Sequence, residues 1–176
     1  MDALVVYESL FGNTAAIAGR IAETLGEQGI AARALPVTHV EPAETEGVDL
    51  LVVGGPTHAH GMSREATRKA GATDKKNTYP EPTVDEGLRD WLDEIASGDG
   101  RGAAAFDTRF DKPAIITGSA AKGFAKKLER HGYRLVAEPE SFFVTTAGSL
   151  EDGEMEHATA WAKALAERVA AGSTRS

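Results

Sequence analysis

The sequence predicts an α/β domain built on a doubly wound parallel sheet. Two short and nearly continuous apolar runs, residues 3–7 and 48–53, are followed by small polar or Gly residues, which is typical of strands buried on both faces. A stretch with helical spacing, residues 14–28, separates them, and further helical stretches follow. Because parallel strands need crossover connections, this alternation indicates helices on both faces of the sheet.

The first half of the chain continues from these two strands. The helix of residues 14–28 carries one apolar stripe and ends at Gly29, and a weaker strand is expected at residues 31–37. Residues 63–82 are polar, lack a hydrophobic period and contain two prolines, so we expect a long excursion with a short helix near residues 64–70. The helical stripe consists of Ile17, Ile21 and Leu25.

The second half of the chain repeats the alternation. Residues 84–96 return to helical spacing, and Thr83 with Glu86 three residues later forms the pattern of a capping box at the helix start. The other expected elements are, in order, a strand at 102–106, an extended segment at 113–117, a helix through Phe124 and Leu128 that stops at Gly132, two pieces of a last strand at 134–137 and 142–145, and a closing helix through Met155, Ala158, Ala162, Leu165 and Val169.

Length, charge and composition restrict the function classes. The 176 residues suit a single domain, 1–171, with a disordered tail, 172–176. The net charge of −8 disfavours binding to nucleic acid or to anionic membranes. Because the sequence has no cysteine, redox chemistry would need a bound organic cofactor. The first residues lack a basic region and their apolar run is too short to span a membrane, so we expect a cytoplasmic protein without membrane insertion.

The loop of residues 9–14 suits a phosphate group. It offers the hydroxyls of Ser9 and Thr14, the amide of Asn13, a close backbone approach at Gly12 and free N–H groups at a helix N-terminus. It lacks the lysine of a P-loop and the three-glycine spacing of dinucleotide sites, so a phosphomonoester fits better. An ordinary helix start capped by Asn13 or Thr14 explains the same residues.

A second loop, residues 54–62, follows the strand of residues 48–53. Glycines at both of its ends would let backbone groups reach a flat polar ring. His58 and His60 resemble half of a metal site, but no carboxylate follows at close ligand spacing, so we expect no metal. The alternative is a Gly/Pro turn with exposed histidines.

A third loop, residues 106–111, follows the strand of residues 102–106. Its two aromatic rings, hydroxyl, carboxylate and guanidinium would allow stacking on a heteroaromatic ring and hydrogen bonding to its edge. The alternative is that Phe106 is the last core residue of the strand and that Asp107 pairs with Arg109.

Together, residues 7–14, 55–58 and 106–109 resemble the flavodoxin-like family over essentially the whole chain. Ser9, Gly12 and Thr14 match the family's phosphate motif, while Phe11 stands where a hydroxyl is usual. The resemblance implies a five-stranded parallel sheet in the order 2-1-3-4-5 and FMN as cofactor. It also implies that the phosphate is held by Ser9, Leu10, Phe11, Gly12, Asn13 and Thr14, that the isoalloxazine is flanked by Pro56, Thr57, His58, Ala59, His60 and Gly61, and that its other side is closed by Phe106, Asp107, Thr108, Arg109 and Phe110.

The chain departs from the family in two respects. The flavin loops lack the usual Trp or Tyr, and residues 63–82 form an insertion. The resemblance favours an electron carrier that shuttles electrons between a reductase and acceptor enzymes, for which the acidic surface would suit basic partners. One alternative is an FMN-dependent NAD(P)H:quinone-type reductase, and another is a module of this fold that has lost tight FMN binding. A phospho-receiver fits less well, since no aspartate ends the strand of residues 48–53.

Two groups of basic residues are open to more than one interpretation. The cations of the insertion could meet a nucleotide phosphate in a reductase or belong to a solvated loop, and the latter is preferred. A stripe at four-residue spacing, on the helix that stops at Gly132, is expected to be solvated or a minor docking surface. The insertion cations are Arg64, Arg68, Lys69, Lys75 and Lys76, and the stripe is Lys122, Lys126 and Arg130.

Overall fold

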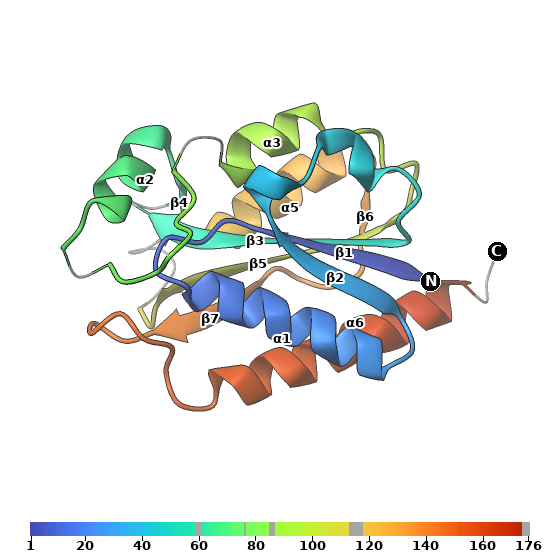
Figure 1. Ribbon diagram of the computed structural model, residues 1–176. Helices are drawn as coiled ribbons and strands as arrows, with labels where there is room; N and C mark the ends of the chain where they lie inside the picture. The colour runs from blue at the N-terminus through green and yellow to red at the C-terminus, as the bar shows by residue number, and fades with distance from the viewer. Residues whose placement is uncertain (59–60, 76, 85–86, 113–117, 174–176) are drawn as a thin grey trace.

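The computed structural model describes residues 1–58, 61–75, 77–84, 87–112 and 118–173. A central sheet lies between two layers of helices, with α1 and α6 on one face and α3 and α5 on the other (Figure 1). In chain order the elements are β1 (Asp2–Tyr7), α1 (Asn13–Glu27), β2 (Ala31–Pro36), two short 3-10 helices (Val37–His39 and Pro42–Thr45), β3 (Leu50–His58), β4 (Gly61–Met62), α2 (Glu65–Ala72), α3 (Leu88–Glu94), β5 (Gly102–Phe110), α5 (Ala120–Arg130), β6 (Arg134–Leu135), β7 (Glu140–Val144) and α6 (Glu154–Ser173).

The sheet confirms the predicted fold class, with a difference in strand number. Strands run in the order β2-β1-β3-β5, all parallel, and the described residues form seven strands where five were expected. The predicted last strand is β6 and β7, both of which pair with β5: β6 with Gly102 and Ala103, and β7 with residues 106–110. The extra strand β4 pairs antiparallel with the end of β3, which extends well past residue 53.

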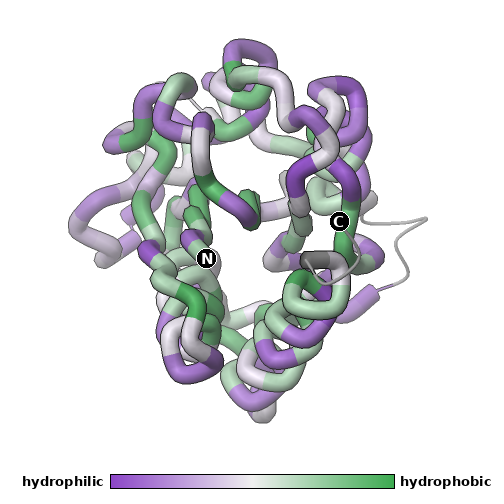
Figure 2. The backbone as a smooth tube through the Cα atoms, turned by 90° about the vertical axis from the view of Figure 1, so that its right-hand side faces the viewer, coloured by the Kyte–Doolittle hydropathy of each residue, from purple (hydrophilic) through white to green (hydrophobic). Residues whose placement is uncertain are grey.

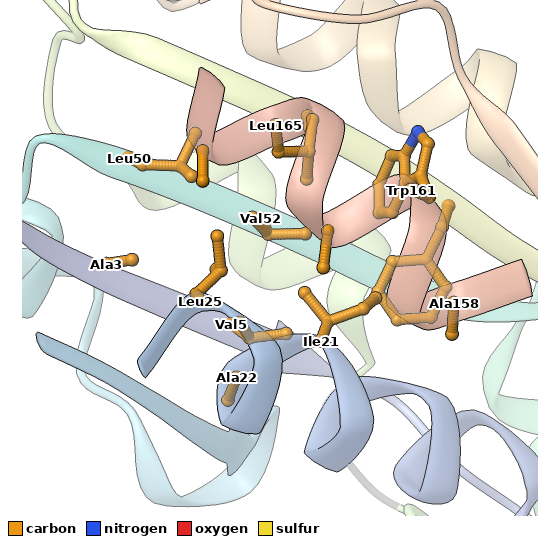
Figure 3. Packing of buried hydrophobic residues seen from close by; sticks show 14 of the residues in the cluster. Ala3, Val5, Ile21, Ala22, Leu25, Leu50, Val52, Ala158, Trp161 and Leu165 are labelled. Atoms are coloured by element: carbon orange, nitrogen blue, oxygen red, sulfur yellow. The ribbon is translucent and has the colours of Figure 1, made fainter. Parts of the chain in front are cut away.

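Both faces of the sheet are buried, which explains the near-continuous apolar strands. Alternate residues of β1 point to opposite faces, so Val5 packs under α1 and α6 while Leu4 packs under α3 and α5. Figure 3 shows Ile21 and Leu25 of α1 facing the sheet beside Leu165 of α6. Hydrophobic and hydrophilic stretches follow one another along the coils of the helices (Figure 2), as expected for helices with one buried face.

Some boundaries differ from the predictions. The capping box at Thr83 is wrong, because α3 begins at Leu88 with Gly87 as its N-cap, and the Thr83 hydroxyl instead accepts the backbone N–H of Ser9 at 3.2 Å. Helix α6 extends through Ser173, so the described part of the expected disordered tail is helical. The short helix near residues 64–70 is confirmed as α2. The extended segment expected at 113–117 lies outside the described residues.

Candidate functional site

A cavity of about 660 Å³ lies at the carboxyl ends of β1, β3 and β5. Ligands of open parallel sheets bind at this edge. Among the predicted site residues, those that line the cavity are Phe11, Asn13, Pro56, Thr57, Thr108, Arg109 and Phe110.

Two further walls of the cavity were missed by the sequence reasoning. One is the excursion, which contributes Asp74, Asn77 and Thr78, and the other is the loop after β7. Asn13 closes the first loop against this last wall, since its Nδ2 donates to the carbonyl of Gly148 at 2.8 Å. The position of the loop after β7 could have indicated this wall, because loops that follow parallel strands lie at the carboxyl edge of the sheet, where ligands bind. This wall consists of Val144, the last residue of β7, followed by Thr146, Ala147, Gly148 and Ser149.

The first loop begins α1 in an unusual way. Its N-cap is Gly12, which has φ of 88°, so the ordinary start capped by Asn13 or Thr14 is wrong. Such a positive φ strongly favours glycine. The buried Ser9 hydroxyl accepts the backbone N–H groups of Gly12 at 3.1 Å and Ala15 at 3.4 Å. Across the loop, the hydroxyls of Thr14 and Thr108 share a hydrogen bond of 2.8 Å.

The same loop keeps several amide donors unused. Among the residues that the structure describes, no hydrogen bond satisfies the backbone N–H of Leu10, Phe11, Asn13 or Thr14. No acidic residue lies in the first turn of α1, so the positive end of the helix dipole is not neutralised there. Phe11 and Asn13 also line the cavity. This end of the cavity is therefore suited to an anionic group.

Gly54 and Gly55, which the structure places within β3, serve core packing. A Cβ on Gly54 would lie 2.0 Å from the ring of Phe106, and one on Gly55 would lie 2.9 Å from Phe124. Approach of a flat ligand ring is therefore not needed to explain these glycines. Thr57 lines the cavity with its hydroxyl in use, since it accepts the N–H of Ala120 and donates to Asp107.

The rest of the predicted second loop is only partly within the described residues. His58 ends β3 and pairs with Gly61 of β4, while Ala59 and His60 lie outside the described residues. In the described parts of the chain, no group of three or more His, Asp or Glu residues could hold a metal ion.

Phe106 belongs to the core, as the alternative interpretation held. It is fully buried, and its ring centroid lies 5.8 Å from Phe142 and 6.1 Å from Trp161. The expectation that it closes one side of a bound ring is therefore wrong. Phe110 lines the cavity with 48% of its surface exposed, and Phe11 lines it with 43% exposed. Exposed aromatic rings at a cavity offer stacking surfaces for a ligand.

Asp107 is buried behind the cavity wall and accepts several hydrogen bonds. Its Oδ2 accepts hydrogen bonds from the hydroxyls of Thr57 and Ser119 and from the N–H of Ala121. Its Oδ1 lies 3.8 Å from Nε of Arg109, which is the ion pair that the alternative interpretation expected. Arg109 is also fixed by Ser141 and by the carbonyl of Lys112. Asp107 therefore ties the ends of β3 and β5 to the start of α5.

The excursion covers two titratable residues at the end of β1. Burial raises the pKa of Glu8, against the opposing effects of Ser63, Leu88 and Arg68. Burial, and then the charge and hydroxyl of Tyr79, raise the pKa of Tyr7 to about 12. Glu8 is therefore buried at the end of β1, while Tyr7 is half-buried.

Comparison with known proteins agrees with this geometry. The flavodoxin family model matches residues 5–89. A flavodoxin from the domain Archaea has 19% identity and a TM-score of 0.67, and covers 96% of this chain and 99% of its own. Flavodoxin 1 from Bacillus cereus has 19% identity and a TM-score of 0.69, with coverage of 95% and 98%. The chain has a flavodoxin-like fold.

A larger protein contains the same fold. Rubredoxin oxygen:oxidoreductase from Desulfovibrio gigas has 16% identity to this chain and a TM-score of 0.63. The match covers 97% of this chain but 36% of the oxidoreductase chain. No curated protein matches the sequence. Within the described residues, no helix is both long and apolar enough to cross a bilayer.

Proposed function

We propose that this flavodoxin-like chain binds FMN in the cavity and carries electrons between a reductase and acceptor proteins. The observation that supports this proposal is one cavity that joins unused amide donors at the start of α1 to the exposed rings of Phe11 and Phe110. FMN is a phosphomonoester joined to a flat heteroaromatic ring, so it needs both features in one site. The volume of the cavity also falls within the range of cofactor pockets.

The phosphate would be held by the first loop. The unused N–H groups of Phe11 and Asn13 would donate to its oxygens. The Ser9 hydroxyl accepts two N–H groups and so keeps its own proton for donation. Arg109 adds a positive charge to the cavity lining, and Asp74 is the acidic residue that the lining contributes.

The ring would be held by aromatic contacts. Phe110 and Phe11 offer apolar surfaces, and Pro56 adds a rigid contact at the end of β3. Bound FMN supplies one- or two-electron transfer chemistry. The part of the chain is to orient the ring and limit the access of water to it, while one edge stays open to a partner.

An electron carrier is favoured over a stand-alone NAD(P)H-dependent reductase. The insertion cations that would meet a nucleotide phosphate are partly in use, since Arg68 is buried against Asp90 at 3.5 Å and Lys69 pairs with Glu65. The flavodoxins to which the chain is similar match it over nearly their whole length. The net charge of −8 suits basic partners. We propose a cytoplasmic location on the same ground, because such partners are soluble enzymes.

The first experiment is an absorption spectrum. We expect flavin bands that stay with the purified protein through gel filtration, or that appear after addition of FMN. Phe110→Ala should weaken FMN binding about fivefold in a fluorescence titration, since an aromatic stack contributes roughly 1 kcal/mol. Asp111→Ala, an exposed neighbour outside the cavity lining, should leave the affinity unchanged. A colourless protein that ignores added FMN would refute the proposal.

A second experiment separates carrier from reductase. The carrier should oxidise NADPH only when a separate reductase is present. Oxidation of NADPH by the isolated protein with a quinone as acceptor would favour the reductase instead.

A further inference from the structure

In the structure the excursion continues past residue 82 to Gly87, the N-cap of α3, and it is bonded to the main chain of the first loop. The N–H of Thr83 donates to the carbonyl of Ser9 at 2.9 Å, and the Thr83 hydroxyl accepts the N–H of Ser9 at 3.2 Å. One residue further along the loop, Nδ2 of Asn77 donates to the carbonyl of Leu10 at 2.9 Å. Two successive carbonyls of the loop therefore point to the excursion.

Asn77 is itself held in place. Its Nδ2 also donates to the carbonyl of Gly71 at 3.1 Å, and its Oδ1 accepts the N–H of Tyr79 at 3.0 Å. The ring of Tyr79 covers Gly12 so closely that a Cβ there would lie 2.9 Å from it. The side chain of Asn77 thus has its amide oriented before any ligand arrives.

A buried cation joins the two ends of the excursion. Arg68 is 1% exposed and bonds to Ser63 and to the carbonyl of Val84, each at 3.2 Å. Gly87 is required beside it, because a Cβ would lie 2.2 Å from Nη1 of Arg68 and 2.9 Å from Oε2 of Glu8. For this part of the insertion the interpretation as a solvated loop is wrong. The excursion that carries Asn77 is therefore held by buried contacts at both of its ends.

Peptide geometry connects these contacts to the cavity. In a trans peptide the carbonyl of one residue and the N–H of the next point in opposite directions, and no described peptide is cis. The carbonyls of Ser9 and Leu10 face the excursion, so the N–H groups of Leu10 and Phe11 face away from it. These are two of the unused donors, and successive N–H groups on one side of a loop make an anion-binding concavity.

We infer that Asn77 is a positioning residue for the phosphate of the bound cofactor, with Thr83 as its partner in the same task. This inference rests on the proposed function. Asn77 fixes the Leu10–Phe11 peptide from outside the loop, so that the N–H of Phe11 is already turned toward the anion. The excursion thereby helps the protein to distinguish FMN from riboflavin, because riboflavin has no phosphate to accept hydrogen bonds from these N–H groups.

The test compares FMN with riboflavin by fluorescence titration of the full-length protein. Asn77→Ala should raise the Kd for FMN about fivefold to tenfold, the equivalent of one or two lost hydrogen bonds, and should change the Kd for riboflavin by less than about twofold. Thr83→Val keeps the size of the side chain and the bond from its N–H, and should give a smaller shift in the same direction. Thr73→Ala is the matched control, since its hydroxyl bonds only within the excursion, to the carbonyls of Lys69 and Ala70.

The outcomes separate this inference from the proposed function. If the unmodified protein binds no flavin, the proposed function fails and the inference falls with it. If the unmodified protein binds FMN, and Asn77→Ala weakens the binding of FMN and riboflavin equally or weakens the binding of neither, the inference alone is overturned. Circular dichroism identifies a variant that has not folded, and if Asn77→Ala is that variant, Thr83→Val decides in the same way.

Discussion

Gly54→Ala is expected to destabilise the protein strongly, because the added methyl group would enter the ring of Phe106. The two residues are register partners on adjacent strands, and the new Cβ would lie 2.0, 2.2 and 2.4 Å from three ring atoms. Ordinary contact begins at 3.4 Å, so the ring would have to retreat by about 1.4 Å. Phe142 and Trp161, with ring centroids 5.8 and 6.1 Å from that of Phe106, prevent this retreat.

The expected cost follows from overpacking of a closed core. Such insertions cost roughly 1–3 kcal/mol, and we expect about 3 kcal/mol here because neighbouring rings confine the phenyl group. For a domain of this size, that loss lowers the Tm by roughly 6–12 °C. Gly54→Ala combined with Phe106→Leu should be less destabilised than the sum of the single variants, by about 1 kcal/mol or more.

Thermal unfolding followed by circular dichroism, together with urea titration, measures these changes. Gly26→Ala is the matched control, because this glycine lies in α1 with nothing within 4 Å of the added Cβ. It should stabilise the protein by about 0.5–1 kcal/mol. If Gly54→Ala lowers the free energy of unfolding by less than about 1 kcal/mol, the side chains around Phe106 can rearrange, and the reasoning from rigid packing is refuted.

Two further substitutions test the buried charges. Asp107→Ala should lower the free energy of unfolding in urea by about 3 kcal/mol, since it removes the acceptor of three hydrogen bonds and the partner of a cation. Asp111→Ala, the control at an exposed position, should change it by no more than about 0.5 kcal/mol. Equal effects of the two substitutions would refute the role of burial. Burial raises the pKa of Glu8 above 4.5, so its contribution to stability is present below that pH and is lost as pH rises through the raised value. The stability of wild type relative to Glu8→Gln should therefore fall as the pH rises above 4.5, and a rise in relative stability would contradict the direction of the shift.

The regular elements of the fold could be predicted because periodicity reflects burial. Ile17, Ile21 and Leu25 repeat at helical spacing and lie against the sheet in α1. Thr83 shows where this reasoning fails. Its spacing to Glu86 suited a capping box, yet its hydroxyl is taken by Ser9, which lies 74 residues away in the chain. Local patterns carry no information on such distant partners.

The candidate site could be predicted in part, for the same reason. Phe106 and Phe110 lie four residues apart on β5 and therefore share a face of the sheet, but only Phe106 reaches Trp161 and the core. Alternation cannot reveal where the covering layer ends. Asn77 carried no signal at all, because it lies in a polar stretch without a period and meets Leu10 only through tertiary packing.

The cavity wall is assembled from five separate stretches of the chain, from Phe11 to Ser149. The family model ends at residue 89, so two of these stretches, residues 108–110 and 144–149, lie beyond the matched region. No short fragment contains the whole wall, so a ligand in the cavity would bind only the complete folded chain. Such a ligand acts as a non-covalent cross-link, which at a hundred times its Kd adds about 2.7 kcal/mol to the free energy of unfolding.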